Sequence, residues 1–227
     1  MALAGPDTAR RRSLVGLGRP LRGQHLQIAA EPGMDVGEVW TSGANVAAGY
    51  WRRPEDSARV FGGTPPGTPV TSARSLRTGD LGFLYRGELF LVGRAKDLII
   101  VRGCNYHPHD LEQSAEAALS APPQSVAAFS IDGADGEELV LALELDGTSD
   151  RLAAACAAAR AAISQHHNLR CHAVVCVPRG GLPRTGSAKL QRGECRRRYL
   201  AGELPVAHAE LSQETAALTP ARPTSLR

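Results

Sequence analysis

The stretch RTGDLGFLYRGELFLVGRAKDLIIVRGCN, residues 77–105, decides how this chain is organised. Two short apolar segments, 81–85 and 88–92, flank the pair Arg86-Gly87, which favours a two-residue turn between paired strands. The stretch therefore predicts a β-hairpin. Beyond the hairpin the pattern changes, because helical spacing begins to alternate with strand-like runs. The sequence thus predicts a change from β-rich to mixed α/β architecture within this stretch.

The part of the chain before Lys96 is predicted to be mostly β. Segments 25–29 and 38–42 read as strands, separated by the turn-rich PGMDVG. Pro54 fits the first position of a short helix, PEDSARVF, because the first helical turn needs no backbone donor there. Glycines and prolines are dense in 62–73, which predicts a loop.

The part after Lys96 alternates strands with helices. An Ala-rich helix is predicted from Arg151, since Leu152, Cys156 and Ile163 fall on one helical stripe. Such alternation is typical of helices packed against a sheet, so the predicted fold class is α/β (α+β). The other predicted elements are strands at 98–101, 125–131, 139–145 and 171–177, and helices at 109–119 and 191–200.

These patterns predict five segments along the chain. The two ends are expected to be disordered, the C-terminal one because it is polar and carries prolines. Lys96 marks the boundary between the two folded parts. The segments are a lead-in at 1–13, a β-rich part at 14–95, the boundary at 96, an α/β domain at 97–205 and a tail at 206–227.

Composition sets broad limits on function. Hydrophobic residues make up 43% and charged residues 22% of the 227, which are ordinary values for a globular protein. Aromatic residues are only 4%, so the cores must be built from Ala, Leu, Val and Ile. The net charge of +3 is too weak to predict nucleic-acid binding.

The number and spacing of the cysteines and the lengths of the apolar runs indicate the cellular compartment of the protein. The five cysteines form no CxxC pair and leave one over, which argues against a disulfide framework and for a reducing environment. No apolar run reaches the length of a membrane span, and the basic residues 10–12 precede a stretch too polar for a signal peptide. We therefore expect a cytoplasmic protein with no membrane span.

Asp80 and Arg94 are candidate nucleotide-binding residues. Asp80 lies in RTGDLG, and a carboxylate beside a glycine can accept hydrogen bonds from both hydroxyls of a ribose. The guanidinium of Arg94, in VGRAKD, can donate to the ribose or to a phosphate. The plainer alternatives are a turn aspartate and a surface arginine at the end of a strand.

Lys189 is the strongest candidate for a catalytic residue. It ends a loop rich in glycine and proline, which can move and become ordered on a ligand. When a carboxylate attacks the α-phosphate of ATP, negative charge builds on both groups, and a lysine between them stabilises it. The phosphate-loop pattern does not fit, since Ser187 stands where its lysine must be. The alternative is a solvated lysine before a helix.

The cluster HHNLRCHAVVC, residues 166–176, contains two cysteines and three histidines, which are common metal ligands. Cys171 and Cys176 are five positions apart, so on a regular strand they face opposite sides. We therefore predict no metal site here, and buried thiols instead. No nucleophile-elbow pattern G-x-S-x-G supports a Ser/His/Asp triad.

Four motifs follow one another in the order seen in the adenylate-forming ligases. They are GEVWTSGANVAAGYWRRPEDS (37–57), RTGDLG (77–82), GRAKDLIIVRG (93–103) and LPRTGSAKLQR (182–192). The chain resembles the C-terminal third of these enzymes over about 16–200. RGCNYHPHDLE (102–112) is most similar to the fatty acyl-AMP ligases, which have Asn followed by Pro-x-Asp in this stretch.

The resemblance implies roles for particular residues. Asp80 and Arg94 would bind the ribose, Lys96 would be the hinge of a mobile C-terminal domain, and Lys189 would be the catalytic lysine. Residues 14–95 would form the end of the large adenylation domain. Ala188 departs from the family, which usually has glycine there, and a β-carbon disfavours a positive φ.

The resemblance also implies substrates and partners. These ligases use ATP and Mg²⁺ to activate a fatty acid, and commonly pass the acyl group to the phosphopantetheine thiol of an acyl carrier protein. Their phosphate loop, adenine segment, magnesium-binding glutamate and acyl tunnel precede this region. We therefore expect a ligase fragment, a split subunit or a truncated gene product that needs an N-terminal ligase portion and is inactive alone. The alternative is a non-catalytic module that docks a carrier protein or ligase partner, for example through the basic residues 196–198.

Overall fold

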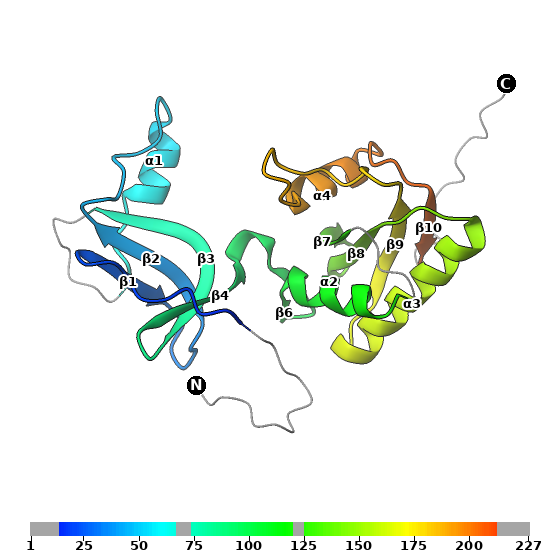
Figure 1. Ribbon diagram of the computed structural model, residues 1–227, viewed down its shortest axis with the longest axis horizontal. Coiled ribbons are helices and arrows are strands. Elements are labelled where there is room, and N and C mark those ends of the chain that lie inside the picture. The colour runs from blue at the N-terminus through cyan, green and yellow to red at the C-terminus, as the bar shows by residue number, and fades with distance from the viewer. Residues whose placement is uncertain (1–13, 67–73, 120–124, 213–227) are drawn as a thin grey trace. The chain divides into compact units, whose positions relative to one another are not determined.

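The computed structural model describes residues 14–66, 74–119 and 125–212. The predicted lead-in at 1–13, most of the loop at 62–73 and the end of the predicted tail lie outside these ranges. The chain divides into two compact units, Met1–Lys96 and Asp97–Arg227, called unit 1 and unit 2 below (Figure 1). Each unit is described by itself.

Unit 1 is built on one antiparallel sheet with strand order β1-β2-β3-β4. The predicted hairpin is confirmed: β3 and β4 are joined by Arg86 and Gly87, whose φ angles of 52° and 81° are the positive pair of a type I′ turn. The elements are β1 (Gln24–Ala29), β2 (Gly37–Gly43), α1 (Pro54–Phe61), β3 (Ser75–Tyr85) and β4 (Glu88–Arg94).

Unit 2 is built on a four-stranded mixed sheet with strand order β10-β9-β8-β7. The strands β7 and β8 form a hairpin, and β8 runs parallel to β9 because α3 crosses over between them. The elements are β5 (Ile99–Val101), β6 (Cys104–Tyr106), α2 (Pro108–Ala117), β7 (Ser125–Gly133), β8 (Gly136–Glu144), α3 (Ser149–His167), β9 (Cys171–Val177), α4 (Arg192–Leu200) and β10 (His208–Leu211). A 3₁₀ turn, η1 (Ala95–Asp97), spans the boundary of the units.

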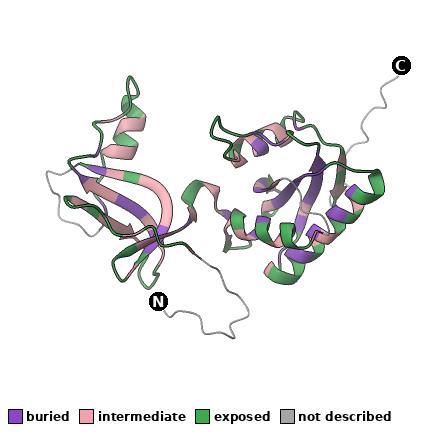
Figure 2. Cartoon of the chain, in the orientation of Figure 1, coloured by how far each residue is buried: buried purple, intermediate pink, exposed green. Residues whose placement is uncertain are grey.

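Helices cover both faces of the unit 2 sheet. Alternate residues of β8 point to opposite faces, so Leu139 and Leu141 pack with α2 and α3, whereas Val140 and Ala142 pack with α4. Figure 2 shows the resulting buried residues along the strands of this unit. The sheet is thus the middle layer of three, as the predicted α/β fold requires.

Two predictions for unit 2 were wrong. The tail from 206 was expected to be disordered, but His208–Leu211 forms β10 on the edge of β9. Ala207 N and Ser212 N donate to Cys176 O and His172 O on either side of it. That edge offers free backbone partners, which a polar local sequence does not reveal.

The second error concerns the cysteines of β9. Cys171 and Cys176 both join the core under α2 and α3, although their spacing predicted opposite faces. A bulge explains this, because Leu139 pairs with Cys171 while Val140 pairs with Ala173. The extra residue between these pairs shifts the alternation by one. Cys176 Sγ therefore lies 3.5 Å from Cys156 Sγ of α3.

Candidate functional site

Asp80 is set by a turn within β3. Thr78 Oγ1 donates to Val39 O at 2.6 Å and accepts from Asp80 N at 3.1 Å. Gly79 between them has a φ of +73°, a left-handed conformation that glycine adopts without cost. The register of β3 shifts at the next residues, where a bulge re-aims neighbouring side chains. The sequence TGD thereby fixes the direction of this carboxylate.

Asp80 and Arg94 contact each other across the hairpin. They are register partners, and Arg94 Nε donates to Asp80 Oδ1 at 2.8 Å. Their side chains are 28% and 51% exposed, so the pair is open to a ligand. An oriented, partly exposed carboxylate can accept hydrogen bonds from a pair of neighbouring hydroxyls. The structure therefore brings together the two residues predicted to bind ribose.

Lys96 is the last residue of unit 1 and lies in η1. The residue after it, Asp97, is fixed to unit 2: its Oδ2 lies 3.8 Å from Arg192 Nη1. Arg192 in turn makes two 2.6 Å hydrogen bonds to the buried carboxylate of Glu112, which raise the pKa of the guanidinium. A rotation about Lys96 would leave Asp97 attached to the body of unit 2.

Lys189 lies in unit 2, in a segment called here the lysine turn, residues 180–190. Thr185 N donates to Lys189 O at 2.8 Å, and Lys189 N donates to Thr185 Oγ1 at 3.1 Å. Ala188 N donates to Thr185 O at 2.9 Å. The turn is therefore held in this conformation by its own hydrogen bonds. The Lys189 residue is exposed.

Ala188 adopts the backbone conformation that was expected to disfavour it. Its φ is +62°, in the left-handed region. A β-carbon there costs about 1–2 kcal/mol. The turn therefore forms without the family's glycine and stores some strain beside Lys189.

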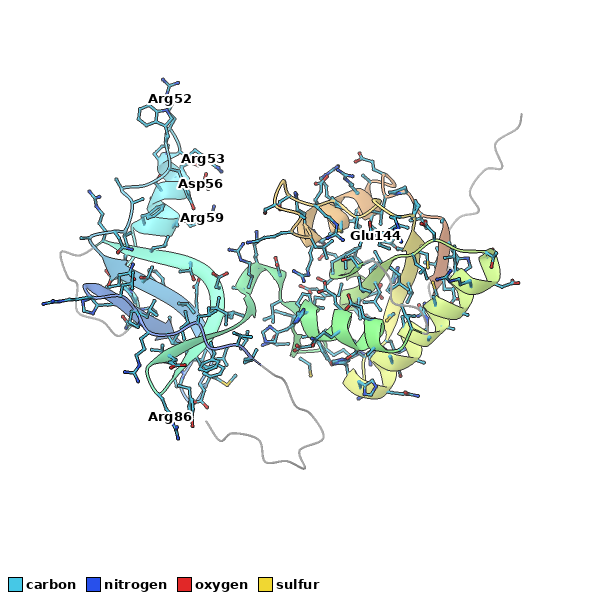
Figure 3. All side chains as sticks on the ribbon, viewed as in Figure 1. Arg52, Arg53, Asp56, Arg59, Arg86 and Glu144 are labelled. Carbon is cyan, nitrogen blue, oxygen red and sulfur yellow. The ribbon has the colours of Figure 1, made fainter. Side chains whose placement is uncertain are left out.

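Sequence reasoning missed two buried carboxylates in unit 2. Glu144 is labelled in Figure 3 and ends β8, and Glu112 lies in α2. Buried carboxylates need partners, and both have arginine partners from the segment around Lys189. The signal for Glu144 is present in the sequence as one charged residue in the apolar run LVLALEL.

The basic residues of α4 are paired within unit 2. Arg196 Nη2 lies 2.8 Å from Asp132 Oδ2, and Arg197 contacts Glu194 and Glu203 at 2.9 and 2.8 Å. Arg198 also contacts Glu194, and the two arginines hold the pKa of that carboxyl at about 2. The sequence showed only Glu194 opposing this stretch, so the predicted free basic face is largely neutralised.

Within the described ranges, no three His, Cys, Asp or Glu side chains group together in a way that could hold a metal ion. In those same ranges no helix combines the length and the apolar character needed to cross a bilayer.

Two mycobacterial ligases are similar to this chain. A putative fatty-acid–CoA ligase of Mycobacterium leprae, FadD21, is 43% identical over 175 residues, which is 72% of this chain and 29% of that protein. The long-chain-fatty-acid–AMP ligase FadD28 of Mycobacterium tuberculosis is 42% identical over 180 residues, covering 74% and 30%. This chain is homologous to the C-terminal part of the adenylate-forming ligases, and its curated relatives are named as fatty-acid–CoA and fatty-acid–AMP ligases.

The fold agrees with this homology. A structure solved in a study of fatty acyl-adenylate ligases from E. coli and L. pneumophila is similar with a TM-score of 0.70 and 28% identity, over 88% of this chain and 35% of that one. A family profile described as Mug62, meiotically up-regulated gene 62 protein-like domain, matches 134–219, within unit 2. The chain spans only about 30% of the length of the curated ligases.

Proposed function

We propose that this chain supplies the ribose-binding edge and the catalytic lysine of an ATP-dependent fatty acyl-AMP ligase. The observation that carries the proposal is the pairing of Asp80 with Arg94 across a hairpin in a chain homologous to such ligases. A turn that presents Lys189 on unit 2 supports it. On this proposal, the chain contributes part of an active site and does not complete adenylation alone.

Asp80 is suited to the ribose of ATP. Its carboxylate is oriented by Thr78 and Arg94 but stays partly exposed, so it can accept hydrogen bonds from two ribose hydroxyls. Arg94 aligns the carboxylate through a charge-assisted hydrogen bond. We assign none of the described residues to Mg²⁺.

Lys189 would act on the charge that develops during adenylation. The fatty-acid carboxylate and the α-phosphate are both anionic, and an ammonium group between them lowers the barrier electrostatically. The exposed lysine on a short ordered turn can reach such a centre. Lys189 is therefore expected to serve the first half-reaction, formation of acyl-AMP.

Lys96 would serve the second half-reaction. A swing of unit 2 between two orientations requires large dihedral changes at a few residues, and Lys96 lies at the boundary of the units. The acyl group would then pass to the phosphopantetheine thiol of an acyl carrier protein. One relative is named a fatty-acid–CoA ligase, so the transfer assay includes CoA as a second acyl acceptor beside the carrier protein.

The test uses this chain joined to the N-terminal portion of a similar ligase, with the two half-reactions measured separately. Lys189→Ala should slow fatty-acid-dependent pyrophosphate exchange by about 10²-fold or more, as loss of a charge-stabilising donor does. It should spare acyl transfer from supplied acyl-AMP. Lys96→Pro, which fixes φ, should impair transfer more than adenylation. If Lys189→Ala slows both steps equally, or neither, the assignment of the catalytic lysine is wrong.

The isolated 227-residue chain is expected to be inactive in adenylation. With ATP, Mg²⁺ and fatty acid, the isolated chain should give no pyrophosphate exchange above background, because positioning of both substrates dominates this chemistry. Robust exchange by the isolated chain would contradict the view that it holds only part of the site.

A further inference from the structure

We propose that Glu144, acting through Arg184, is a positioning residue for Lys189. This inference rests on the proposed function for the role of Lys189 and adds two residues to it. A series of contacts leads from the end of the core strand β8 to the backbone of Lys189. Every contact lies within unit 2.

Glu144 holds a fixed position at the end of a core strand. It is the last residue of β8, and its side chain is only 2% exposed. Oε1 accepts from Gly180 N at 2.6 Å, and Oε2 accepts from Arg184 Nη2 at 3.0 Å. One carboxylate therefore fixes both the beginning and the middle of the lysine turn. A buried carboxylate is costly without such partners, so its placement indicates a specific role.

Arg184 links the buried carboxylate of Glu144 to the backbone beside Lys189. While Nη2 binds Glu144, Nη1 donates to Ala188 O at 3.2 Å. That carbonyl belongs to the peptide group that joins Ala188 to Lys189. The planar guanidinium thus holds this peptide at a fixed distance from the core carboxylate, which a flexible lysine side chain does not do.

Thr185 completes the series. It follows Arg184 in the chain and binds both backbone groups of Lys189: Thr185 N donates to Lys189 O, and Thr185 Oγ1 accepts from Lys189 N. The backbone of Lys189 is therefore fixed on both sides by a residue whose neighbour is anchored in the core. Only the side chain of the lysine keeps its freedom.

Such an anchor matters because charge stabilisation depends on position. A group displaced by about 1 Å from the reacting centre can lose about 10²-fold in rate. The left-handed φ of Ala188 works against the turn, so a contact from outside the turn adds to the hydrogen bonds that hold it. The pair Glu144–Arg184 supplies that contact.

The variants must separate positioning from stability. Removing one partner leaves a buried, unpaired charge and destabilises the fold generally. The double change Glu144→Met with Arg184→Met removes both charges, and well-packed apolar pairs are often as stable as the ion pair. The conservative change Arg184→Lys keeps the charge but loses the planar fork. Arg179→Ala is the matched control, since the exposed side chain of this arginine makes a 3.9 Å contact to Asp146 next to the turn. The hydrogen bond from Arg179 N to Asp146 Oδ1 is a backbone contact that the substitution keeps.

The first readout is amide hydrogen exchange in the 227-residue chain. Exchange at Thr185 N, Ala188 N and Lys189 N should become about 10-fold faster in the double variant and in Arg184→Lys, as for a loss of local stability of about 1.4 kcal/mol. Amides of β9 should keep their protection in both. Arg179→Ala should match the wild type. Unchanged exchange at the three turn amides, or equal acceleration in β9, would overturn the anchor.

The second readout is the ratio of the two half-reactions in the joined ligase described above. Both variants should slow adenylation and spare acyl transfer, in the same direction as Lys189→Ala. If the turn loosens and Lys189→Ala slows adenylation while these variants do not, positioning by Glu144 is refuted. If Lys189→Ala itself has no effect, the proposed role of the lysine fails, and exchange alone then decides whether Glu144 anchors the turn.

Discussion

Unit 2 covers both faces of its sheet with helices, whereas in the described part of unit 1 a four-stranded sheet packs against one short α-helix, α1. Of the buried apolar residues within 14–66, 74–119 and 125–212, five lie in unit 1 and thirty in unit 2. Figure 2 shows the same contrast, with intermediate residues along the strands of unit 1. Hydrophobic burial is the main stabilising term in folding, so the units should differ strongly in stability.

The contrast also shows how each unit fixes its candidate residues. In unit 1, Asp80 and Arg94 are oriented by the local geometry of one hairpin. In unit 2, the lysine turn is anchored to a packed core by a buried carboxylate. A site residue can thus be positioned either by a tight local turn or by a distant rigid core.

The largest expected effect is a difference in the free energy of unfolding between the two units when they are expressed separately. Residues 97–227 should unfold cooperatively in urea, while residues 1–96 should be less stable by at least about 3 kcal/mol, a large part of a typical domain's stability. The measurement is circular dichroism with urea, supported by hydrogen exchange on the full chain. Equal midpoints for the two pieces would contradict the comparison.

A matched pair of leucines tests the same contrast by single substitution. Leu141 on β8 is fully buried, so Leu141→Ala should cost about 2–5 kcal/mol through lost contacts and a cavity. Leu84 on β3 is 42% exposed, so Leu84→Ala should cost less than about 1 kcal/mol. Urea unfolding of the full chain, followed by exchange within each unit, assigns each loss. Similar costs would mean that unit 1 packs better than its burial indicates.

A smaller pair of changes compares left-handed positions in the two units. Gly79→Ala in unit 1 should destabilise by about 1 kcal/mol, because its φ is +73° although open space surrounds the added methyl. Ala188→Gly in unit 2 should be neutral or stabilising by up to about 1 kcal/mol, because it removes the same strain.

The control for these changes is Ala157→Gly on the exposed side of α3, where φ is helical and glycine should cost about 1 kcal/mol. Thermal unfolding with a local exchange readout distinguishes the three variants. A destabilising Ala188→Gly would show that the turn gains more from the alanine than it loses in strain.

The smallest expected effect is a pH-dependent change in stability when a surface ion pair of α4 is removed. Arg197 and Arg198 lower the pKa of Glu194 from its ordinary 4.5 to about 2. The stabilisation is therefore fully present above pH 4.5 and is lost as the pH falls towards 2. Glu194→Gln should lower the urea midpoint slightly at pH 7, and the difference from the wild type should vanish near pH 2. A constant difference at every pH would show that the pairing does not cause it.

Local rules predicted much of the fold. The turn Arg86-Gly87, the helix beginning at Pro54 and the strand at 171–177 agree with the structure, because each depends on backbone preferences of adjacent residues. The edge strand β10 was missed, because the hydrogen-bonding partner that orders it comes from a strand about 30 residues away.

The sequence by itself determined the family and the β3–β4 hairpin, because a two-residue turn sets the register of the strands beside it. The regular register would pair Asp80 with Gly93, and the bulge between Leu81 and Gly82 places Arg94 opposite Asp80 instead. Only the tertiary structure decided that Glu144 meets Arg184, forty positions away, and that the arginines of α4 have carboxylate partners. The physical reason is that local dihedral preferences fix short-range register, whereas the partner of a buried charge depends on how distant elements pack. The anchor of the lysine turn belongs to the second kind.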